Sequence, residues 1–269
     1  MKFLIAFLLS STAFAYVLEY DTIISRTAKN HGAGAYHIQQ VVEWKSGEGS
    51  LYHVNEDWWV DSESKMKLNL QGAGLLKNQV NGEIIYSANR RKVYDSGEKL
   101  TTTRWPQNFS PVFFHFRSSG WMKSYLHQIG MTGAESLQGR PPFSADSAPK
   151  YTGQNFVNLK RIGGTITYGI GTAQAPYLFI EQDQFVVTQV SFPTGATVTA
   201  HNYEEFSGGF YYPKLIVYKW GNNEVTVNLK RVTYLGRNPK PSVFQGDSKN
   251  PTFQWSDEIP LKEFYSLFR

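Results

Sequence analysis

The fold of this chain is decided by residues 156–236, which read FVNLKRIGGTITYGIGTAQAPYLFIEQDQFVVTQVSFPTGATVTAHNYEEFSGGFYYPKLIVYKWGNNEVTVNLKRVTYLG. Seven short segments of this stretch are rich in β-branched and aromatic residues, which favour strands, and Gly, Pro, Asn or Asp separates most of them. Because short turns join consecutive strands, we expect antiparallel pairing. The predicted strands are Phe156–Arg161, Thr165–Gly171, Tyr177–Gln182, Phe185–Phe192, Ala196–Tyr203, Leu215–Trp220 and Glu224–Leu235.

A second series of strands is predicted nearer the N-terminus. In the segment 65–70 the apolar side chains of Met66, Leu68 and Leu70 alternate with polar ones, which is typical of a half-buried strand. Asn81-Gly82 is a hairpin signal in front of the last strand of the series. The full set is Ala35–Lys45, Ser50–Val54, Trp58–Val60, Lys65–Leu70 and Glu83–Ala88.

Helical segments precede and interrupt the strands. Asp21–Asn30 has apolar residues at helical spacing, and Pro111–Gly130 predicts one or two helical turns followed by an amphipathic helix. A sheet of this length must curl into a barrel or half-barrel, or split into a sandwich, and helices can cover its concave side. The predicted fold class is therefore mainly β (α+β): a curved antiparallel sheet that forms an incomplete β-barrel, with helices covering the concave side.

The first residues predict export. Lys2 precedes the apolar run Phe3–Leu9, and Ala13-Phe14-Ala15 is an A-x-A cleavage pattern. We therefore expect a cleavable signal peptide over residues 1–15, although a buried strand or helix is the alternative interpretation. Residues 16–236 then form a single half-barrel domain, with a helical lid at about 111–130 and a long loop at 131–155.

Residues 237–269 are expected to form a linker and a C-terminal tail. Leu261, Phe264 and Phe268 fall on one face of a helix predicted over Ile259–Arg269. That apolar face either packs onto the body of the protein or docks a partner.

No catalytic or metal-binding pattern is recognisable. Cysteine is absent from all 269 residues, which excludes disulfides, thiolate metal sites and cysteine nucleophiles. The six histidines lack ligand spacing, and neither H-E-x-x-H nor G-x-S-x-G occurs. S-x-x-K occurs without the companion motifs of serine enzymes, at Ser62, Ser64, Ser96 and Ser147. We predict that the protein is not an enzyme and uses no cofactor or metal; a secreted hydrolase is one alternative.

Aromatic side chains are more frequent than a core of this size requires. The chain has 18 Phe, 16 Tyr and 7 Trp residues, some of them adjacent, as in Trp58-Trp59 and Phe210-Tyr211-Tyr212. Adjacent residues of a strand point to opposite faces, so one of each pair faces away from the core or into a second apolar space. The surplus indicates either packing at the rim or an apolar cavity for a hydrophobic ligand.

Several features appear in an order that is typical of one family. They are a signal peptide followed by the helix Asp21–Asn30 and the strand Tyr36–Trp44, the helical interruption Phe113–Gly130, the hairpin formed by Pro176–Ile180 and Phe185–Val190, and Phe210–Ile216 followed by a strand pair that ends at Val225–Val232. In these features the chain resembles the periplasmic lipoprotein-carrier (LolA-like) superfamily, which includes outer-membrane lipoprotein-sorting proteins. The resemblance covers roughly Asp21–Gly236. The connection Met131–Gln154 is long for the family, and the tail Arg237–Arg269 has no counterpart in its pattern.

The resemblance implies a soluble periplasmic carrier whose apolar cavity holds the acyl chains of lipoproteins or other lipids beneath a helical lid. Relatives of this fold also act as sensors that bind a membrane-protein partner, so a sensor or scaffold is a second alternative. The expected partners are an acylated lipoprotein or lipid and an inner- or outer-membrane protein bound through the tail. Nucleic acid is not expected, because the net charge of +5 forms no long basic stripe. We expect a monomer.

The residues expected to line the cavity are apolar and come from the strands and the lid. They are Val42, Trp44, Met66, Leu68, Leu70, Phe113, Trp121, Leu126, Phe179, Phe185 and Val187. The choice in the later strands depends on register, since a shift of one residue turns every side chain to the other face.

Overall fold

The computed structural model describes residues 18–62, 65–87, 90–94, 100–133, 156–171, 176–245, 252–253 and 260–269. The predicted signal peptide and most of the predicted loop 131–155 lie outside these residues.

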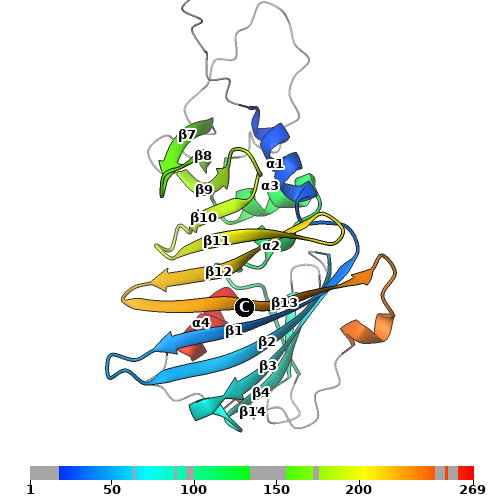
Figure 1. Cartoon of the computed structure of the whole chain (residues 1–269), viewed down its shortest axis with the longest axis vertical. Helices are drawn as coiled ribbons and strands as arrows, with labels where there is room; N and C mark the ends of the chain where they lie inside the picture. Colours follow the sequence, from blue (N-terminus) through cyan, green and yellow to red (C-terminus); the bar gives the residue numbers. More distant parts are fainter. Residues whose placement is uncertain are drawn as a thin grey trace, which may run out of the picture.

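Within the described residues, fourteen strands form one antiparallel sheet, and thirteen of them follow each other in the order β6-β5-β4-β3-β2-β1-β13-β12-β11-β10-β9-β8-β7 (Figure 1). The sheet is open, because β6 and β7 lie at its two ends, so the predicted incomplete barrel is confirmed. The strands are β1 Ala35–Lys45, β2 Leu51–Ser62, β3 Lys65–Ala73, β4 Val80–Ser87, β5 Arg90–Tyr94, β6 Leu100–Arg104, β7 Phe156–Ile162, β8 Thr165–Gly171, β9 Pro176–Glu181, β10 Val187–Ser191, β11 Thr197–Phe206, β12 Phe210–Trp220, β13 Asn223–Gly236 and β14 Thr252–Phe253.

One seam joins the two series of strands. β1 pairs with β13, with Ile38 opposite Val232 and Val42 opposite Val227. Each series is otherwise a meander of neighbouring strands, which is what the short predicted turns imply. The strands predicted in residues 156–236 are therefore the second half of a single sheet, and β1–β6 are the first half.

The turn between β3 and β4 differs from the prediction. Asn81-Gly82 lies inside β4, and the chain reverses instead through a 3₁₀ turn, η1 (Gly74–Leu76). Gly72 permits this tight reversal, since a Cβ atom at this position would lie only 2.1 Å from the carbonyl oxygen of Leu76. β2 is also one continuous strand where two were predicted.

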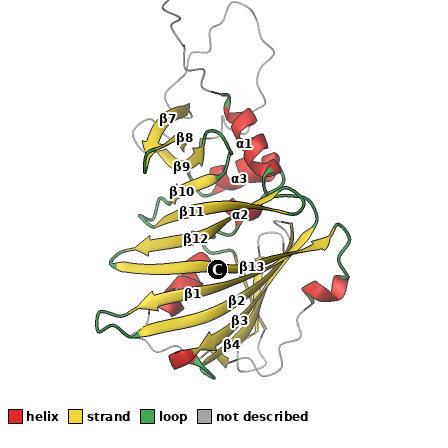
Figure 2. Ribbon diagram, viewed as in Figure 1, coloured by secondary structure: helices red, strands yellow, loops and turns green. Residues whose placement is uncertain are grey.

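Four α-helices of the described chain cover the same face of the sheet, which we call the inner face (Figure 2). α1 packs against α3, and the ammonium of Lys123 lies 3.1 Å from the carboxylate of Asp21. The Ser118 hydroxyl caps α3 by accepting a hydrogen bond from the Trp121 amide. The helices are α1 Tyr20–Lys29, α2 Val112–His115, α3 Ser119–Gln128 and α4 Leu261–Phe268.

The tail crosses from the outer face to the inner face. The 3₁₀ turn η3 (Pro241–Phe244) lies against the outer side of β3, where the Lys65 ammonium stands over the Phe244 ring and the Lys67 ammonium donates to the Gln245 carbonyl at 3.0 Å. β14 then pairs with β4. The chain reaches the inner face with α4, so the apolar face of the tail helix packs onto the body of the protein (Figure 1).

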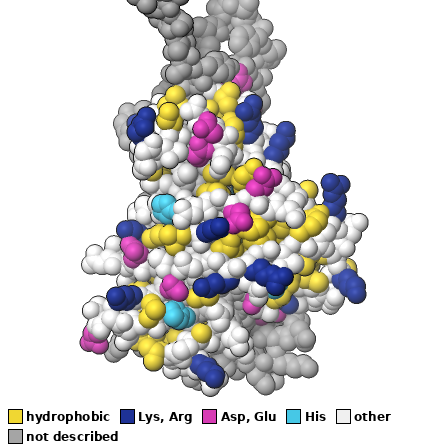
Figure 3. Space-filling model, viewed as in Figure 1, with side chains coloured by type: hydrophobic (Ala, Val, Ile, Leu, Met, Phe, Trp, Pro, Cys, Tyr) yellow, Lys and Arg dark blue, Asp and Glu magenta, His cyan; other side chains and the backbone are white. Residues whose placement is uncertain are grey.

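The outer face is polar in character. Basic and acidic side chains are scattered over the face shown in Figure 3, with hydrophobic side chains between them. Ion pairs such as Lys214–Glu204 and Lys219–Glu224, at 2.7 Å each, are largely exposed and contribute little to stability.

Candidate ligand-binding interior

The inner face is lined by one continuous cluster of buried apolar side chains. Alternate residues of the strands from both halves of the sheet point to it, and the lid helices α2 and α3 add their own apolar residues. Most of the predicted lining residues lie in this cluster: Val42, Met66, Leu68, Leu70, Phe113, Leu126, Phe185 and Val187.

Two predicted lining residues, Trp121 and Phe179, point away from this cluster, and a third, Trp44, packs against it from its margin. Trp121 is 43% exposed, because the buried side of α3 is formed by Met122, Tyr125 and Leu126, and Trp121 is turned away from that side. Trp44 is only partly buried, and its ring lies 5.2 Å from that of Tyr52.

On β9 the predicted register is inverted. Leu178 and Ile180 belong to the inner cluster, and Phe179 between them does not. Side chains alternate along a strand, so Phe179 points to the outer face, where it pairs with Gly169 of β8. The prediction was wrong because three consecutive apolar residues do not indicate which side chain faces the inner side of the sheet.

Phe185 reaches the cluster from a turn and not from a strand. Its φ of 56° lies in the left-handed region, which is rare for a bulky residue. The Arg26 guanidinium stands over its ring at 4.8 Å, and the Asn30 side chain donates to its carbonyl oxygen at 3.3 Å. Contacts from α1 and from the residue that follows it therefore hold this turn in place.

A carboxylate lies on the apolar inner face. Glu56 of β2 is 1% exposed and accepts hydrogen bonds from the Gln40 amide at 2.5 Å and from the Trp58 indole at 3.0 Å. The Tyr212 hydroxyl donates in turn to the Gln40 carbonyl oxygen at 3.1 Å. The sheet itself thus holds this carboxylate in one orientation.

Arg269, which follows α4, neutralises Glu56. Its Nε atom lies 3.1 Å from the Glu56 carboxylate, and its Nη1 atom donates to the Tyr218 hydroxyl at 2.9 Å. Burial alone would lower the pKa of the guanidinium, but the Glu56 carboxylate and Tyr218 raise that pKa above its ordinary value. The guanidinium also stands over the Phe264 ring at 4.7 Å.

Two neutral histidines lie where the lid meets the sheet. Burial lowers the pKa of His31 to about 4, and its Nδ1–H donates to the Phe116 carbonyl oxygen. Burial, together with His31 and Arg117, lowers the pKa of His115 well below its ordinary value. The His115 ring stacks on those of Phe210 and Tyr212, so this part of the lid packs around a neutral imidazole.

Three buried polar atoms of the inner face have no hydrogen-bond partner in the described structure. They are the Tyr86 hydroxyl, His115 Nδ1 and Trp220 Nε1. Each such atom costs on the order of 1–3 kcal/mol. Polar atoms of a bound ligand could satisfy them, so the inner face has both an apolar surface and a few fixed polar positions.

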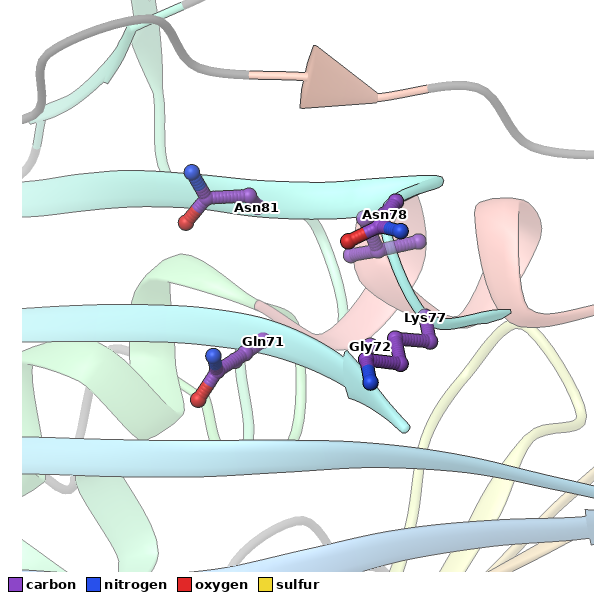
Figure 4. Close-up of a pocket in the computed structure, with 6 residues that line it drawn as sticks. Gln71, Gly72, Lys77, Asn78 and Asn81 are labelled. Carbon is purple, nitrogen blue, oxygen red and sulfur yellow. The ribbon is translucent and has the colours of Figure 1, made fainter. Parts of the chain in front are cut away.

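A separate hollow of about 360 Å³ opens at the β3–β4 turn (Figure 4). It is lined by Gln71, Gly72, Lys77, Asn78, Val80 and Asn81. None of the predicted lining residues contributes to this hollow, and its amide-rich wall does not suit an acyl chain.

Sequence reasoning missed the pair formed by Glu56 and Arg269. A signal was present in the alternation of β2. The residues on its apolar side are Val54, Glu56, Trp58 and Val60, so an acidic residue lies among apolar ones. The polar run 55–57 instead suggested a break between two strands. The partner could not be found in the sequence, because it lies 213 residues further along the chain.

Two kinds of site are not seen in the part of the chain that the structure describes. No group of three or more His, Asp or Glu side chains is arranged to hold a metal ion. No helix there has the length and apolarity needed to cross a membrane.

Comparison with solved structures shows a shared fold. A LolA superfamily protein from Nitrosomonas europaea matches with a TM-score of 0.53 at 9% sequence identity, over 86% of this chain and 99% of that chain. A DUF1329 family protein from Desulfovibrio piger matches with a TM-score of 0.51 at 9% identity, over 84% of this chain and 97% of that chain. No family model and no curated protein matches the sequence. The chain therefore has a LolA-like fold, as the order of its elements predicted.

Proposed function

We propose that this protein is a non-enzymatic periplasmic carrier that binds the acyl chains of lipoproteins, or of other lipids, against its inner face. The observation that carries this proposal is the continuous apolar cluster that joins both halves of the sheet to the lid helices. An acyl chain on such a surface gains ~0.8 kcal/mol for each CH₂ group that leaves water. Export of the chain, which the sequence predicts, would bring it to acylated cargo.

The proposed contacts come from two sides. Met66, Leu68 and Leu70 form a row along β3, and Val42 of β1 lies in the same buried cluster. Phe113 of α2 and Leu126 of α3 face the sheet from the lid. Movement of the lid would then expose or enclose the chain, with no covalent chemistry.

A peptide-binding sensor or scaffold is the second candidate. The observation that favours it is α4, an amphipathic helix that the inner face already accommodates. A helix from a membrane-protein partner would use the same apolar surface.

A titration with a synthetic triacylated lipopeptide separates the candidates, with the same peptide lacking acyl chains as the control ligand. We expect only the acylated form to bind, by a change in intrinsic tryptophan fluorescence. Equal binding of both forms would favour the peptide sensor, and binding of neither would contradict the carrier.

Two matched variants locate the bound chain. Met66→Gln places an amide on the inner face and should weaken binding roughly tenfold, because an unsatisfied amide costs on the order of 1–3 kcal/mol. Leu51→Gln is the control, since Leu51 lies 46% exposed on the other side of the sheet. A larger loss of affinity in Leu51→Gln than in Met66→Gln would place the site elsewhere.

A further inference from the structure

We infer that α4 covers the proposed ligand-binding face and that the Glu56–Arg269 ion pair holds it there. A ligand then reaches this face by displacing α4. The inference rests on the proposed function only for the nature of the ligand, an acylated molecule. The position of α4, its mode of attachment and its tether each support it.

α4 lies against β12. Its Phe264 and Phe268 rings lie 5.0 Å from the ring of Tyr218, and Phe268 also lies 5.4 Å from Trp220. Tyr218 and Trp220 belong to β12, next to the β1–β13 seam. The helix therefore covers the middle of the surface on which an acyl chain would lie.

The attachment of α4 is made by side chains. Among the described residues, α4 takes no part in the pairing of the strands. Arg91 donates to the carbonyl oxygens of Tyr265 and Arg269, and the Asn223 amide lies 3.4 Å from the Glu263 carboxylate. Release of α4 would therefore leave every ladder of the sheet intact.

α1 is attached differently, which gives a contrast within the same molecule. The Tyr211 amide donates to the Asn30 carbonyl oxygen at 2.8 Å, directly after α1, and His31 forms a β-bridge with Phe210. Moving α1 away would break main-chain hydrogen bonds to β12. Of the two helices, α4 is the one whose release leaves the main-chain pairing of β12 unchanged.

The ion pair sets the balance between bound and released α4. Glu56 accepts hydrogen bonds from Gln40 and Trp58, which belong to the sheet and not to α4. Neutralising either charge leaves the other one buried without compensation as long as α4 stays bound. Both charges regain water when α4 leaves, so neutralisation favours release.

The tether keeps a released α4 close to the site. η3 stays on the outer side of β3 through the Lys67–Gln245 hydrogen bond, and β14 stays paired with β4. A tethered helix has a high effective concentration at its own site and competes with a ligand in solution. The apparent dissociation constant of the ligand is then its intrinsic value divided by the fraction of molecules in which α4 is released.

Hydrogen exchange of the full-length protein measures the release directly, with the amides of α3 as the internal reference. Arg269→Gln and Glu56→Gln should each raise exchange in α4 roughly a hundredfold, since breaking a buried pair favours opening by at least that factor, and should raise exchange in α3 by a smaller factor. Lys214→Gln is the matched control, because it removes the same charge from an ion pair whose two side chains are about half exposed. Saturating the wild type with the triacylated lipopeptide should also raise exchange in α4.

The affinity of the same lipopeptide completes the test. We expect Arg269→Gln to lower the apparent dissociation constant by the factor by which it raises α4 exchange. Exchange that rises by the same factor in α4 and α3 would overturn the inference, and so would selective release of α4 with unchanged affinity. Selective release without lipopeptide binding in any variant would support a releasable helix and contradict the proposed carrier function.

Discussion

The guanidinium of Arg269 lies 3.1 Å from the carboxylate of Glu56, and both residues are only 1% exposed. The aromatic face of α4 could pack on an apolar sheet in several registers, because dispersion contacts are not directional. The ion pair permits only one register, in which Arg269 also reaches Tyr218 and Ser110. The aromatic rings thus hold the helix against the sheet by packing, and the charged groups determine its position on the sheet.

A double-mutant cycle should reveal this coupling. We expect Arg269→Gln and Glu56→Gln to lower the free energy of unfolding by about 3–5 kcal/mol each, because each leaves one buried charge unpaired. The double variant should lose clearly less than the sum, since no charge is then buried. Urea unfolding followed by tryptophan fluorescence measures all three, and strictly additive losses would show that the two residues act separately.

Stability should fall as the pH drops from about 6.5 to 4. His31 has its pKa lowered to about 4 in the folded protein, so the unfolded chain takes up a proton in this window and the folded protein does not. The stabilisation is complete above pH 6.5 and is lost by about pH 4, and for His31 alone it amounts to roughly 3 kcal/mol. Burial also holds the pKa of His115 well below its ordinary value, so His115 adds to the loss of stability in acid.

Urea unfolding at pH 7, 5.5 and 4 checks this dependence. His31→Gln should be less stable than the wild type at pH 7 and should lose less stability on acidification. A wild-type free energy of unfolding that is flat between pH 6.5 and 4 would contradict the buried neutral state of His31.

Two glycines provide a matched pair of alanine substitutions. Gly72→Ala should destabilise the protein by about 1–3 kcal/mol or more, because its Cβ would lie 2.1 Å from the backbone oxygen of Leu76. Gly47→Ala adds the same methyl group in open space and should leave stability unchanged or slightly higher. Thermal unfolding of both variants tests the turn, and equal transition temperatures would contradict the described η1 geometry.

The lid offers a comparison of two aromatic residues. Phe113 is fully buried against Tyr125 and Phe192, so Phe113→Ala should cost about 3–5 kcal/mol. Trp121 lies on the outer side of α3, so Trp121→Ala should cost about 1 kcal/mol or less. Chemical unfolding distinguishes them, and the reverse order would mean that α3 is turned the other way.

The sheet was predictable because its determinants are local. Alternation in β3 and the turn residues of the 156–236 stretch identified strands whose pairing follows from short connections. The short strands β5 and β6 were not predicted, since Arg90–Tyr94 and Leu100–Arg104 are polar and lack an alternating apolar pattern. The Asn81-Gly82 signal was wrong because Gly72 allowed an earlier turn.

The interior was predictable only in part. Residues of a clearly alternating segment, such as Met66 and Leu68, lie on the buried side of their strand, as expected. Trp121 and Phe179 were misplaced, because helix rotation and strand register in apolar runs depend on long-range packing. The pairing of Glu56 with Arg269 depends on the path of the tail around the sheet edge, which no local pattern encodes.

Native mass spectrometry of the full-length protein, purified from cells without detergent exchange, tests the central claim most directly. The account predicts a protein that carries acylated molecules, with a larger loaded fraction in Arg269→Gln than in the wild type or in Lys214→Gln. A bare protein mass in all three samples, unchanged after incubation with the triacylated lipopeptide, would contradict it.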